Sequence, residues 1–534
     1  MLFPADAVPM PSMNENPIKK IVFIEPKSPG THVYKKWGFP RLGTIILGTI
    51  LRNAGYEVQI FIESVKGIDW DAVFDADAVG ISTITSTAPR AYEMAHHIRK
   101  AGIPVFMGGP HVSFLFEEAL LHCDFVLCGE TEETILDFIS ALDGKKGFEE
   151  IPGLVWHYGN RICKNPLPEA CPDLDKFPIP DFSLIRGNKK IGVDLSITPI
   201  MMSRGCPFGC NFCSVTRMFG RKYRFRSVDN VMQELRERRP EWVFFYDDNF
   251  AANRAHTKEL LRRMIREKVT PKWMAQVRID VADDPELMDL MVQSQCKYVY
   301  IGLESINPET LKNLNKGQTR EEIERSIGII QSRGIRVHGM FIFGADTDSP
   351  KTIRETVRFA KKNGLSSVQF MILTPLPGTP VFEQLEREGR LLSRDWEYYD
   401  AHHVVFQPKG MSYIQLQKKT LSATLKFYSL SRLIGKINRF DIWSVIINAY
   451  GWRLSRQMRR STKGFVKNLK KRYAEMGTDL GNARVSMGIK ARKTSEDLRD
   501  FFQSINWDKI RRRKDIVIKD ELDACHMNNG KEAS

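Results

Sequence analysis

Arg204-Gly205-Cys206-Pro207-Phe208-Gly209-Cys210-Asn211-Phe212-Cys213 is the segment that most constrains the fold and the chemistry of this chain. It places three cysteines within eight residues, separated by three residues and then by two. Clustered thiols in a chain without an export signal indicate a metal site in a reducing compartment. Thiolates are soft ligands that select zinc or an iron–sulfur cluster. Structural zinc usually takes four protein ligands, and no fourth cysteine or histidine lies nearby in the sequence. The triplet therefore favours a four-iron cluster with one iron left open.

The residues around the triplet alternate between apolar strands and amphipathic helices. Six candidate strands are separated by helical patterns, at residues 197–203, 242–247, 273–279, 298–303, 336–343 and 367–374. This rhythm predicts a (βα)6 partial TIM barrel over residues 196–385. Chemistry in such barrels lies at the C-terminal ends of the strands, and the triplet follows the first strand.

A second α/β pattern precedes the barrel. Residues 19–140 contain short, continuous apolar strands separated by helices, which is typical of a parallel sheet covered on both faces. The pattern predicts a flavodoxin-like (Rossmann-like) doubly wound domain, whose ligands bind at the carboxyl ends of the strands. Those strand ends carry small and polar residues, among them Ser82, Thr83, Gly108, Gly109, Gly129 and Glu130.

The remaining segments are assigned from their composition. Residues 1–18 form an N-terminal extension that lacks the features of a signal peptide. Residues 141–195 are a Pro-rich linker with a short hairpin, residues 386–430 an accessory helical segment, and residues 431–534 a basic α-helical C-terminal region. No apolar run approaches the roughly 18 residues of a membrane span, so we expect a soluble cytoplasmic protein.

The net charge of +15 on 534 residues belongs mostly to the C-terminal region. Residues 431–534 contain 24 Lys and Arg against 12 Asp and Glu, whereas the rest of the chain is nearly neutral. Apolar residues recur there at helical spacing, at Trp443, Ile446, Ile447, Tyr450 and Leu454. A basic amphipathic helix can make peripheral contact with an anionic membrane. A helix that packs its apolar side on the barrel produces the same pattern, and we favour this second interpretation.

The triplet, the aromatic residue before its third cysteine and the six βα units resemble the radical S-adenosylmethionine (radical SAM) enzymes. The resemblance implies that Cys206, Cys210 and Cys213 hold a 4Fe-4S cluster, whose open iron binds S-adenosylmethionine. An external one-electron reductant such as flavodoxin or ferredoxin then drives cleavage to a 5′-deoxyadenosyl radical, which takes hydrogen from the substrate. No further catalytic residue is implied.

Four other residues are implied to contact S-adenosylmethionine, namely Phe212, Asp248, Arg278 and Glu304. The family often carries Gly-Gly-Glu after the second strand, whereas this chain has Tyr246-Asp247-Asp248-Asn249 there. From the sequence alone, Asp248 is equally a turn residue, Arg278 a surface ion-pair partner and Glu304 a helix cap.

An α/β domain before such a barrel resembles the cobalamin-binding subfamily, which includes magnesium-protoporphyrin ester cyclase and hopanoid methylases. The resemblance implies that cobalamin is bound by Ser82, Thr83, Gly108, Gly109, Gly129 and Glu130. The Asp-x-His-x-x-Gly motif, whose histidine ligates cobalt in many such domains, is absent here. His32 in the first loop could replace it, although a lone loop histidine is more often a surface residue. A degenerate α/β domain with a purely structural role is the alternative.

Three functions are compatible with the sequence. The first is a cobalamin-dependent radical methyltransferase that transfers a methyl group from methylcobalamin to an unactivated carbon of a small-molecule or lipid-like substrate. The second is a radical cyclase or rearrangement enzyme with the same cofactors. The third is a metal-containing nucleic-acid-binding protein, which an open cluster disfavours because a purely structural metal site is usually closed. We therefore expect no nucleic acid partner.

Overall fold

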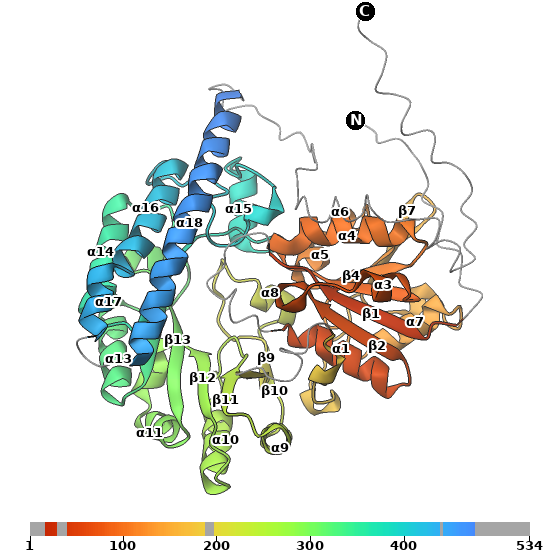
Figure 1. The fold of residues 1–534 in the computed structure, drawn as a ribbon, viewed down its shortest axis with the longest axis horizontal. Helices are drawn as coiled ribbons and strands as arrows, with labels where there is room; N and C mark the ends of the chain where they lie inside the picture. The colour runs from red at the N-terminus through yellow and green to blue at the C-terminus, as the bar shows by residue number, and fades with distance from the viewer. Residues whose placement is uncertain (1–16, 29–39, 187–196, 438–441, 476–534) are drawn as a thin grey trace, which may run out of the picture.

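Two parallel sheets, one in each half of the chain, organise the computed structural model (Figure 1). The structure describes residues 17–28, 40–186, 197–437 and 442–475. The loop histidine His32 and the C-terminal residues 476–534 lie outside the described residues. No helix in the described part of the chain is long and apolar enough to cross a membrane.

The first sheet has seven strands in the order β2-β1-β3-β4-β5-β6-β7. Its parallel part consists of β1 (Lys20–Glu25), β2 (Glu57–Ile62), β3 (Ala78–Ser82), β4 (Val105–Gly108) and β5 (Phe125–Leu127). The hairpin expected in the Pro-rich segment forms from β6 (Leu154–Tyr158) and β7 (Arg161–Lys164). It extends this sheet, because β6 pairs with β5 in the antiparallel sense.

Alternate residues of the first sheet enter two separate cores. Val22 and Ile24 pack with α3 (Trp70–Phe74) and α4 (Ala88–Lys100). Ile21 and Phe23 pack on the other face. That face is covered by α1 (Leu42–Asn53) and α7 (Ile135–Leu142). Helices on both faces explain why the strands read as continuous apolar runs, and they confirm the doubly wound prediction.

The second sheet has six parallel strands in the order β15-β14-β13-β12-β11-β8. They are β8 (Thr198–Ile200), β11 (Trp242–Phe245), β12 (Lys272–Val277), β13 (Cys296–Glu304), β14 (Arg336–Phe343) and β15 (Ser367–Ile372). The helices between them include α9 (Val228–Arg238), α10 (Arg254–Arg266), α11 (Pro285–Gln293), α12 (Pro308–Asn313), α13 (Arg320–Ser332) and α14 (Pro350–Lys362). Because β8 and β15 are the two edges, the structure is an open partial barrel, as predicted.

The first barrel strand is shorter than the sequence predicts. It ends at Ile200, because the backbone N–H of Met202 donates to the carboxylate of Asp247, at 3.2 Å, instead of to a sheet neighbour. Ser203 and Arg204 then form a separate short strand, β9, which pairs with β10 (Arg224–Phe225). This turn carries the chain away from the sheet edge directly before the cysteine triplet.

The C-terminal helices pack on the barrel. They are α16 (Tyr413–Phe427), α17 (Leu430–Ile437) and α18 (Ile442–Glu475), and α18 runs beside the other two (Figure 1). Ile447 of α18 contacts apolar residues of the barrel, and Leu454 is buried. This packing agrees with the favoured interpretation of the amphipathic pattern; the side chain of Trp443 lies outside the described part.

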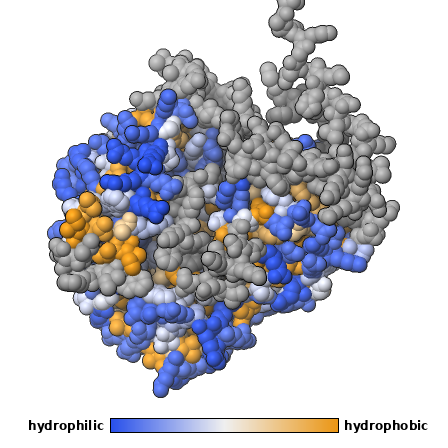
Figure 2. All heavy atoms as spheres, in the orientation of Figure 1, coloured by the Kyte–Doolittle hydropathy of each residue, from blue (hydrophilic) through white to orange (hydrophobic). Residues whose placement is uncertain are grey.

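A small apolar surface remains on the outside of these helices. Leu430 and Ile434 on α17, and Ile446 on α18, are each at least half exposed. Figure 2 shows apolar atoms at the surface in the part of the molecule where α17 and the start of α18 lie.

Candidate active site between the two sheets

The cysteine loop is held by segments far from it in sequence. The side-chain amide of Asn315 donates to the carbonyl of Gly209 at 2.7 Å, and that of Asn211 donates to the carbonyl of Asn313 at 2.5 Å. The backbone N–H of Val381, at the start of α15 (Pro380–Arg387), donates to the carbonyl of Asn211 at 3.3 Å. Loops at two other strand ends therefore fix the triplet at the C-terminal mouth of the barrel.

The three cysteines have the donor chemistry that an iron–sulfur cluster requires. Cys206, Cys210 and Cys213 are free thiols, each partly exposed. Burial raises the pKa of Cys213 to about 12, and the neighbouring Asp248 and the other two cysteines add to the shift. Within the described residues, no three His, Cys, Asp or Glu side chains are placed so that they could hold one metal ion. The three thiols therefore share one loop but do not point to a common centre. Three soft thiols on one loop, beside an acid, have the donor chemistry that fits an iron–sulfur cluster.

The two acids after β11 have different environments. Asp247 is fully buried and accepts hydrogen bonds from the Met202 N–H and the Ser203 hydroxyl, so it fixes the backbone before the cysteine loop. Asp248 keeps contact with solvent, yet enough protein surrounds it that burial raises its pKa to about 6. Of the two, Asp248 is the acid directed toward the cysteine loop, since its charge acts on Cys206 and Cys213.

Arg278 contacts the cysteine loop, and Phe212 packs on the barrel core. The guanidinium of Arg278 lies 3.8 Å from the ring centre of Phe208, inside the loop, and donates to the carbonyl of Lys316 at 2.7 Å. Arg278 is thus not the surface ion-pair partner that the sequence allowed. Phe212 packs, partly buried, against the barrel core.

Glu304 is a buried ion-pair partner and not a helix cap. It ends β13 at an irregularity in the sheet, has a positive φ of 56°, and pairs with the ammonium of Lys316 at 2.7 Å. Gly302 leaves room for this pair, because an added Cβ would lie 2.3 Å from the Glu304 carboxylate and 2.8 Å from the Lys316 ammonium, and the two side chains would have to shift. The cap of α12 is Asn307 instead. Sequence reasoning missed Lys316, which belongs to no motif.

The strand ends of the N-terminal domain hold the residues predicted to contact cobalamin. Thr83 donates from its backbone N–H and its hydroxyl to the carbonyl of Gly108, at 2.8 and 3.0 Å. Gly109 has a φ of 101°, and a Cβ there would lie 2.3 Å from the Thr83 carbonyl, so this glycine permits close packing of two loops. Gly108 and Gly129 leave space, since an added Cβ would meet nothing nearer than 3.5 Å at either.

Ser82 is held by an arginine that the sequence did not single out. Arg41 donates to the carbonyl of Ser82 at 2.9 Å and to its hydroxyl at 3.1 Å. The Arg41 backbone N–H also donates to the buried carboxylate of Glu25, which ends β1. Burial raises the pKa of Tyr246, the charges of Glu25 and Asp248 add to this shift, and that of Arg41 opposes it. Arg41 thus joins the loops that follow β1 and β3.

Glu130 joins the two domains. Its carboxylate accepts from Arg204, at 2.8 Å, and from Arg224, and Arg204 also pairs with Glu132 at 2.5 Å. All four side chains are nine-tenths or more buried. We call Glu130, Glu132, Arg204 and Arg224 the interdomain clamp. Arg204 stands two residues before Cys206, so the clamp links the end of β5 directly to the cysteine loop.

A second set of contacts joins the two domains. The indole N–H of Trp396 donates to the carboxylate of Glu118 at 2.8 Å, and its ring lies 5.2 Å from that of His111. Gly378 packs against the ring of Phe114, where a Cβ would come within 2.5 Å. The clamp and this contact thus join the two domains at two separate places.

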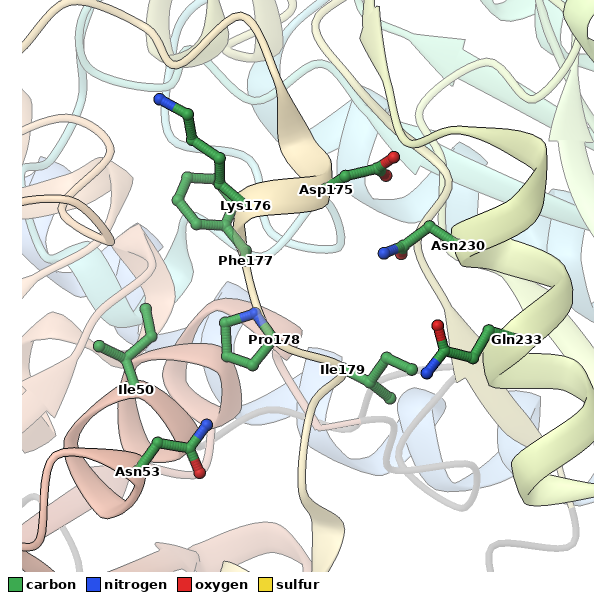
Figure 3. Close-up of a pocket in the computed structure, with 9 residues that line it drawn as sticks. All are labelled: Ile50, Asn53, Asp175, Lys176, Phe177, Pro178, Ile179, Asn230 and Gln233. Carbon is green, nitrogen blue, oxygen red and sulfur yellow. The ribbon is translucent and has the colours of Figure 1, made fainter.

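A surface hollow of about 460 Å³ lies away from these strand ends (Figure 3). It is lined by α1, by residues 175–179 and by α9. Asp175 accepts from the backbone N–H of Ser227 at 2.9 Å, and Asn230 accepts from Arg226 at 2.7 Å. These polar groups stabilise the start of α9, and the hollow has no direct part in the site.

Comparison with known proteins agrees with this architecture. Residues 200–360 match the Radical SAM superfamily, and residues 39–139 match the B12 binding domain. The chain belongs to the radical SAM enzymes that carry a cobalamin-binding domain. It is therefore an enzyme whose cofactors are a 4Fe-4S cluster, S-adenosylmethionine and cobalamin. Such enzymes act on a small-molecule substrate and need a reductant.

Two relatives show the range of activities near this chain. It is 28% identical over 449 residues to bacteriochlorophyllide d C-12(1)-methyltransferase of Chlorobaculum tepidum, covering 82% of this chain and 94% of that protein. It is 24% identical to the anaerobic magnesium-protoporphyrin IX monomethyl ester cyclase of Rubrivivax gelatinosus, covering 77% of each. In fold it is similar to the radical SAM methyltransferase TsrM from Kitasatospora setae, with a TM-score of 0.62 and 17% identity over 83% of this chain and 100% of that one.

Proposed function

We propose that this enzyme methylates an unactivated carbon of a largely apolar small molecule, with a tetrapyrrole as the first substrate class to test. The observation that carries the proposal is the interdomain clamp, which joins Glu130 at the end of β5 to Arg204 beside the cysteine loop and so supports a cobalamin site near that loop. When bound, the cluster and S-adenosylmethionine supply a radical that removes hydrogen, and methylcobalamin supplies a methyl group. The similarity to a bacteriochlorophyllide methyltransferase supports the choice of substrate class.

The protein residues hold and orient these groups. Cys206, Cys210 and Cys213 ligate the cluster through their thiolates. Asp248 would accept hydrogen bonds from the amino group of S-adenosylmethionine, and Arg278 supports the cysteine loop by stacking on Phe208. Phe212 and Glu304 complete this side of the site, Glu304 through its ion pair with Lys316.

The small strand-end residues of the N-terminal domain bind the cobalamin. Gly108 and Gly129 let the corrin approach the backbone, since neither position is crowded where a Cβ would stand. Ser82, Thr83 and Gly109 shape the same edge, and Glu130 positions it through the clamp.

A radical cyclase with the same cofactors is the second candidate, supported by the similarity to the ester cyclase. The two candidates differ in whether a methyl group enters the product. We predict that reconstituted enzyme given S-adenosylmethionine with a deuterated methyl group, a reductant and a bacteriochlorophyllide yields a product heavier by one labelled methyl group. Mass spectrometry of the product distinguishes the candidates: a converted product without label would establish the cyclase.

The electron donor and the cellular location form a further part of the proposal. A flavodoxin or ferredoxin in the cytoplasm supplies the electron.

The enzyme also makes peripheral contact with membranes that hold apolar substrates. The exposed apolar residues Leu430, Ile434 and Ile446 support this contact, because the helices that carry them are rich in Lys and Arg.

We predict that the triple substitution Leu430→Ser, Ile434→Ser and Ile446→Ser weakens binding to anionic vesicles by at least about tenfold, since burial of even one of the three apolar side chains contributes on the order of 1.5 kcal/mol. Co-sedimentation with phosphatidylglycerol vesicles measures this change. The matched control is Leu121→Ser, an exposed leucine of the N-terminal domain. Equal binding of all three proteins would remove the proposed contact.

A further inference from the structure

The segment that follows the cysteine triplet carries an excess of positive charge. Residues 214–226 contain five Lys and Arg and no Asp or Glu. Two of the five, Arg224 and Arg226, are buried and form ion pairs with Glu130 and Glu234. The other three are exposed, and none of them forms a salt bridge with another residue that the structure describes. We call these three exposed cations the basic patch: Arg217, Arg221 and Lys222.

The basic patch packs directly on the cysteine loop. The backbone of the patch touches the start of the loop, since a Cβ added at Gly205 would lie 2.5 Å from the carbonyl oxygen of Lys222. The guanidinium of Arg221 donates to the carbonyl of Pro207 at 3.2 Å, and its Nη2 would lie 3.8 Å from a Cβ at Gly209. The patch therefore contacts the residues that directly precede the first two cysteines of the triplet.

The surface around the patch also has apolar parts. Pro207, inside the cysteine loop, is exposed, and the ring of Phe225, three residues after Lys222, is 36% exposed. Arg217 stands on α8 (Val215–Phe219), a short helix that begins two residues after Cys213. Small surfaces that combine cations with apolar contacts suit brief encounters between electron-transfer proteins, which bury less than about 1,200 Å².

We propose that the basic patch docks the acidic one-electron carrier protein that reduces the cluster. The carboxylates of such a carrier are attracted to the three cations, which speeds the encounter and orients the carrier against the cysteine loop. One electron leaves the reduced carrier and enters the cluster, so the carrier is oxidised by one electron and no covalent bond forms or breaks. This assignment rests on the proposed electron donor, and it names the surface that receives that donor.

The size and the position of the patch favour this partner over other anions. A nucleic acid uses a longer track of cations, since its complexes commonly engage about six to ten phosphates. The patch has three cations, and they are gathered on the loop that carries the cluster ligands. An electron donor gains most from contact at this loop, because docking there keeps the path of the electron short.

The first test measures binding of the carrier. The double substitution Arg217→Glu and Lys222→Glu reverses two charges of the patch and keeps Arg221, whose bond to Pro207 supports the loop. Binding of oxidised flavodoxin to the reconstituted full-length enzyme is measured by calorimetry at low and at high salt. We expect at least about tenfold weaker binding by the variant at low salt and little difference at high salt, because salt screens exposed charges. Carbodiimide should cross-link Lys222 of the wild type to a flavodoxin carboxylate.

The second test compares two reductants. With limiting reduced flavodoxin, the variant should form 5′-deoxyadenosine at least about tenfold more slowly than the wild type. With reduced methyl viologen, a small cation that needs no docking surface, the two proteins should react at the same rate. The matched control is the pair Arg354→Glu and Arg358→Glu, which changes the net charge equally. Both arginines are exposed on α14, which connects β14 to β15 at the sheet edge opposite β8, so this control should behave as the wild type with both reductants.

Unchanged flavodoxin binding in the patch variant, or an equal loss of rate with both reductants, would overturn the assignment. Failure of the wild type to bind flavodoxin and ferredoxin alike would also overturn it. Weaker binding to phosphatidylglycerol vesicles with unchanged flavodoxin binding would assign the surface to lipid instead. These outcomes are separable from failure of the proposed function, since carrier binding and cleavage of S-adenosylmethionine are read without methyl transfer. An enzyme that passes both tests and transfers no methyl group would refute the proposed function and keep the docking surface.

Discussion

Substitution of any one cysteine of the triplet by serine should abolish cleavage of S-adenosylmethionine. A hydroxyl is a poor ligand for iron, and loss of one of three thiolates leaves the cluster with two. We expect cleavage to fall by more than about 100-fold, because changes to residues outside the ligand shell of a metal site already cost about 10–100-fold. The formation of 5′-deoxyadenosine under dithionite, together with iron and sulfide content, measures this effect.

The matched control for the triplet is Cys163→Ser. Cys163 is also a partly exposed free thiol, but it lies on β7 at the far edge of the N-terminal sheet. This variant should keep its iron and its cleavage activity. A triplet variant with full iron content and wild-type cleavage would refute the assignment of that cysteine as a ligand.

Arg204→Met should have the second largest effect, because it leaves two buried carboxylates without their shared partner. Removing one member of a buried ion-pair network typically costs about 3–5 kcal/mol. Glu132 loses its arginine entirely and Glu130 keeps only Arg224. We expect a lower melting temperature and, at temperatures where the protein stays folded, loss of methyl transfer beyond the loss of S-adenosylmethionine cleavage.

The ratio of methylated product to 5′-deoxyadenosine tests whether the clamp positions the two domains. A purely structural role lowers both products equally, whereas mispositioned domains lower the ratio. Adding Glu132→Gln to Arg204→Met should recover part of the stability, since the uncompensated charge is removed. Arg99→Met is the control, because Arg99 pairs with Asp124 inside the N-terminal domain. A ratio unchanged by Arg204→Met would argue against positioning by the clamp.

The sequence predicts the sheets of this protein well, because apolar strands and helix signals are local. The predicted strand 336–343 coincides with β14. The fifth strand of the first sheet also forms, and the triplet follows the first barrel strand, as expected. The same local reasoning placed Asp248 beside the cysteines, where its charge acts on two of them.

The long-range partners could not be predicted in the same way. From its place after β5, Glu130 was expected to contact cobalamin. The structure shows that it also bonds to Arg204 and Arg224, which are 74 and 94 residues away and could not be paired with it from local patterns. Arg41 and Lys316 belong to no motif, and only the folding of distant loops brings them to Ser82 and Glu304. The charges of Arg204 and Arg224, which flank the cysteine loop, were the one hint in the sequence. An arginine that becomes buried requires a carboxylate partner somewhere in the fold.

The most direct test of the account is anaerobic reconstitution of the full chain with iron, sulfide and cobalamin, followed by reduction in the presence of S-adenosylmethionine. The account predicts about four iron atoms and about one cobalamin per chain, with reductive formation of 5′-deoxyadenosine. Tightly bound zinc in place of iron, with no cleavage of S-adenosylmethionine, would contradict it.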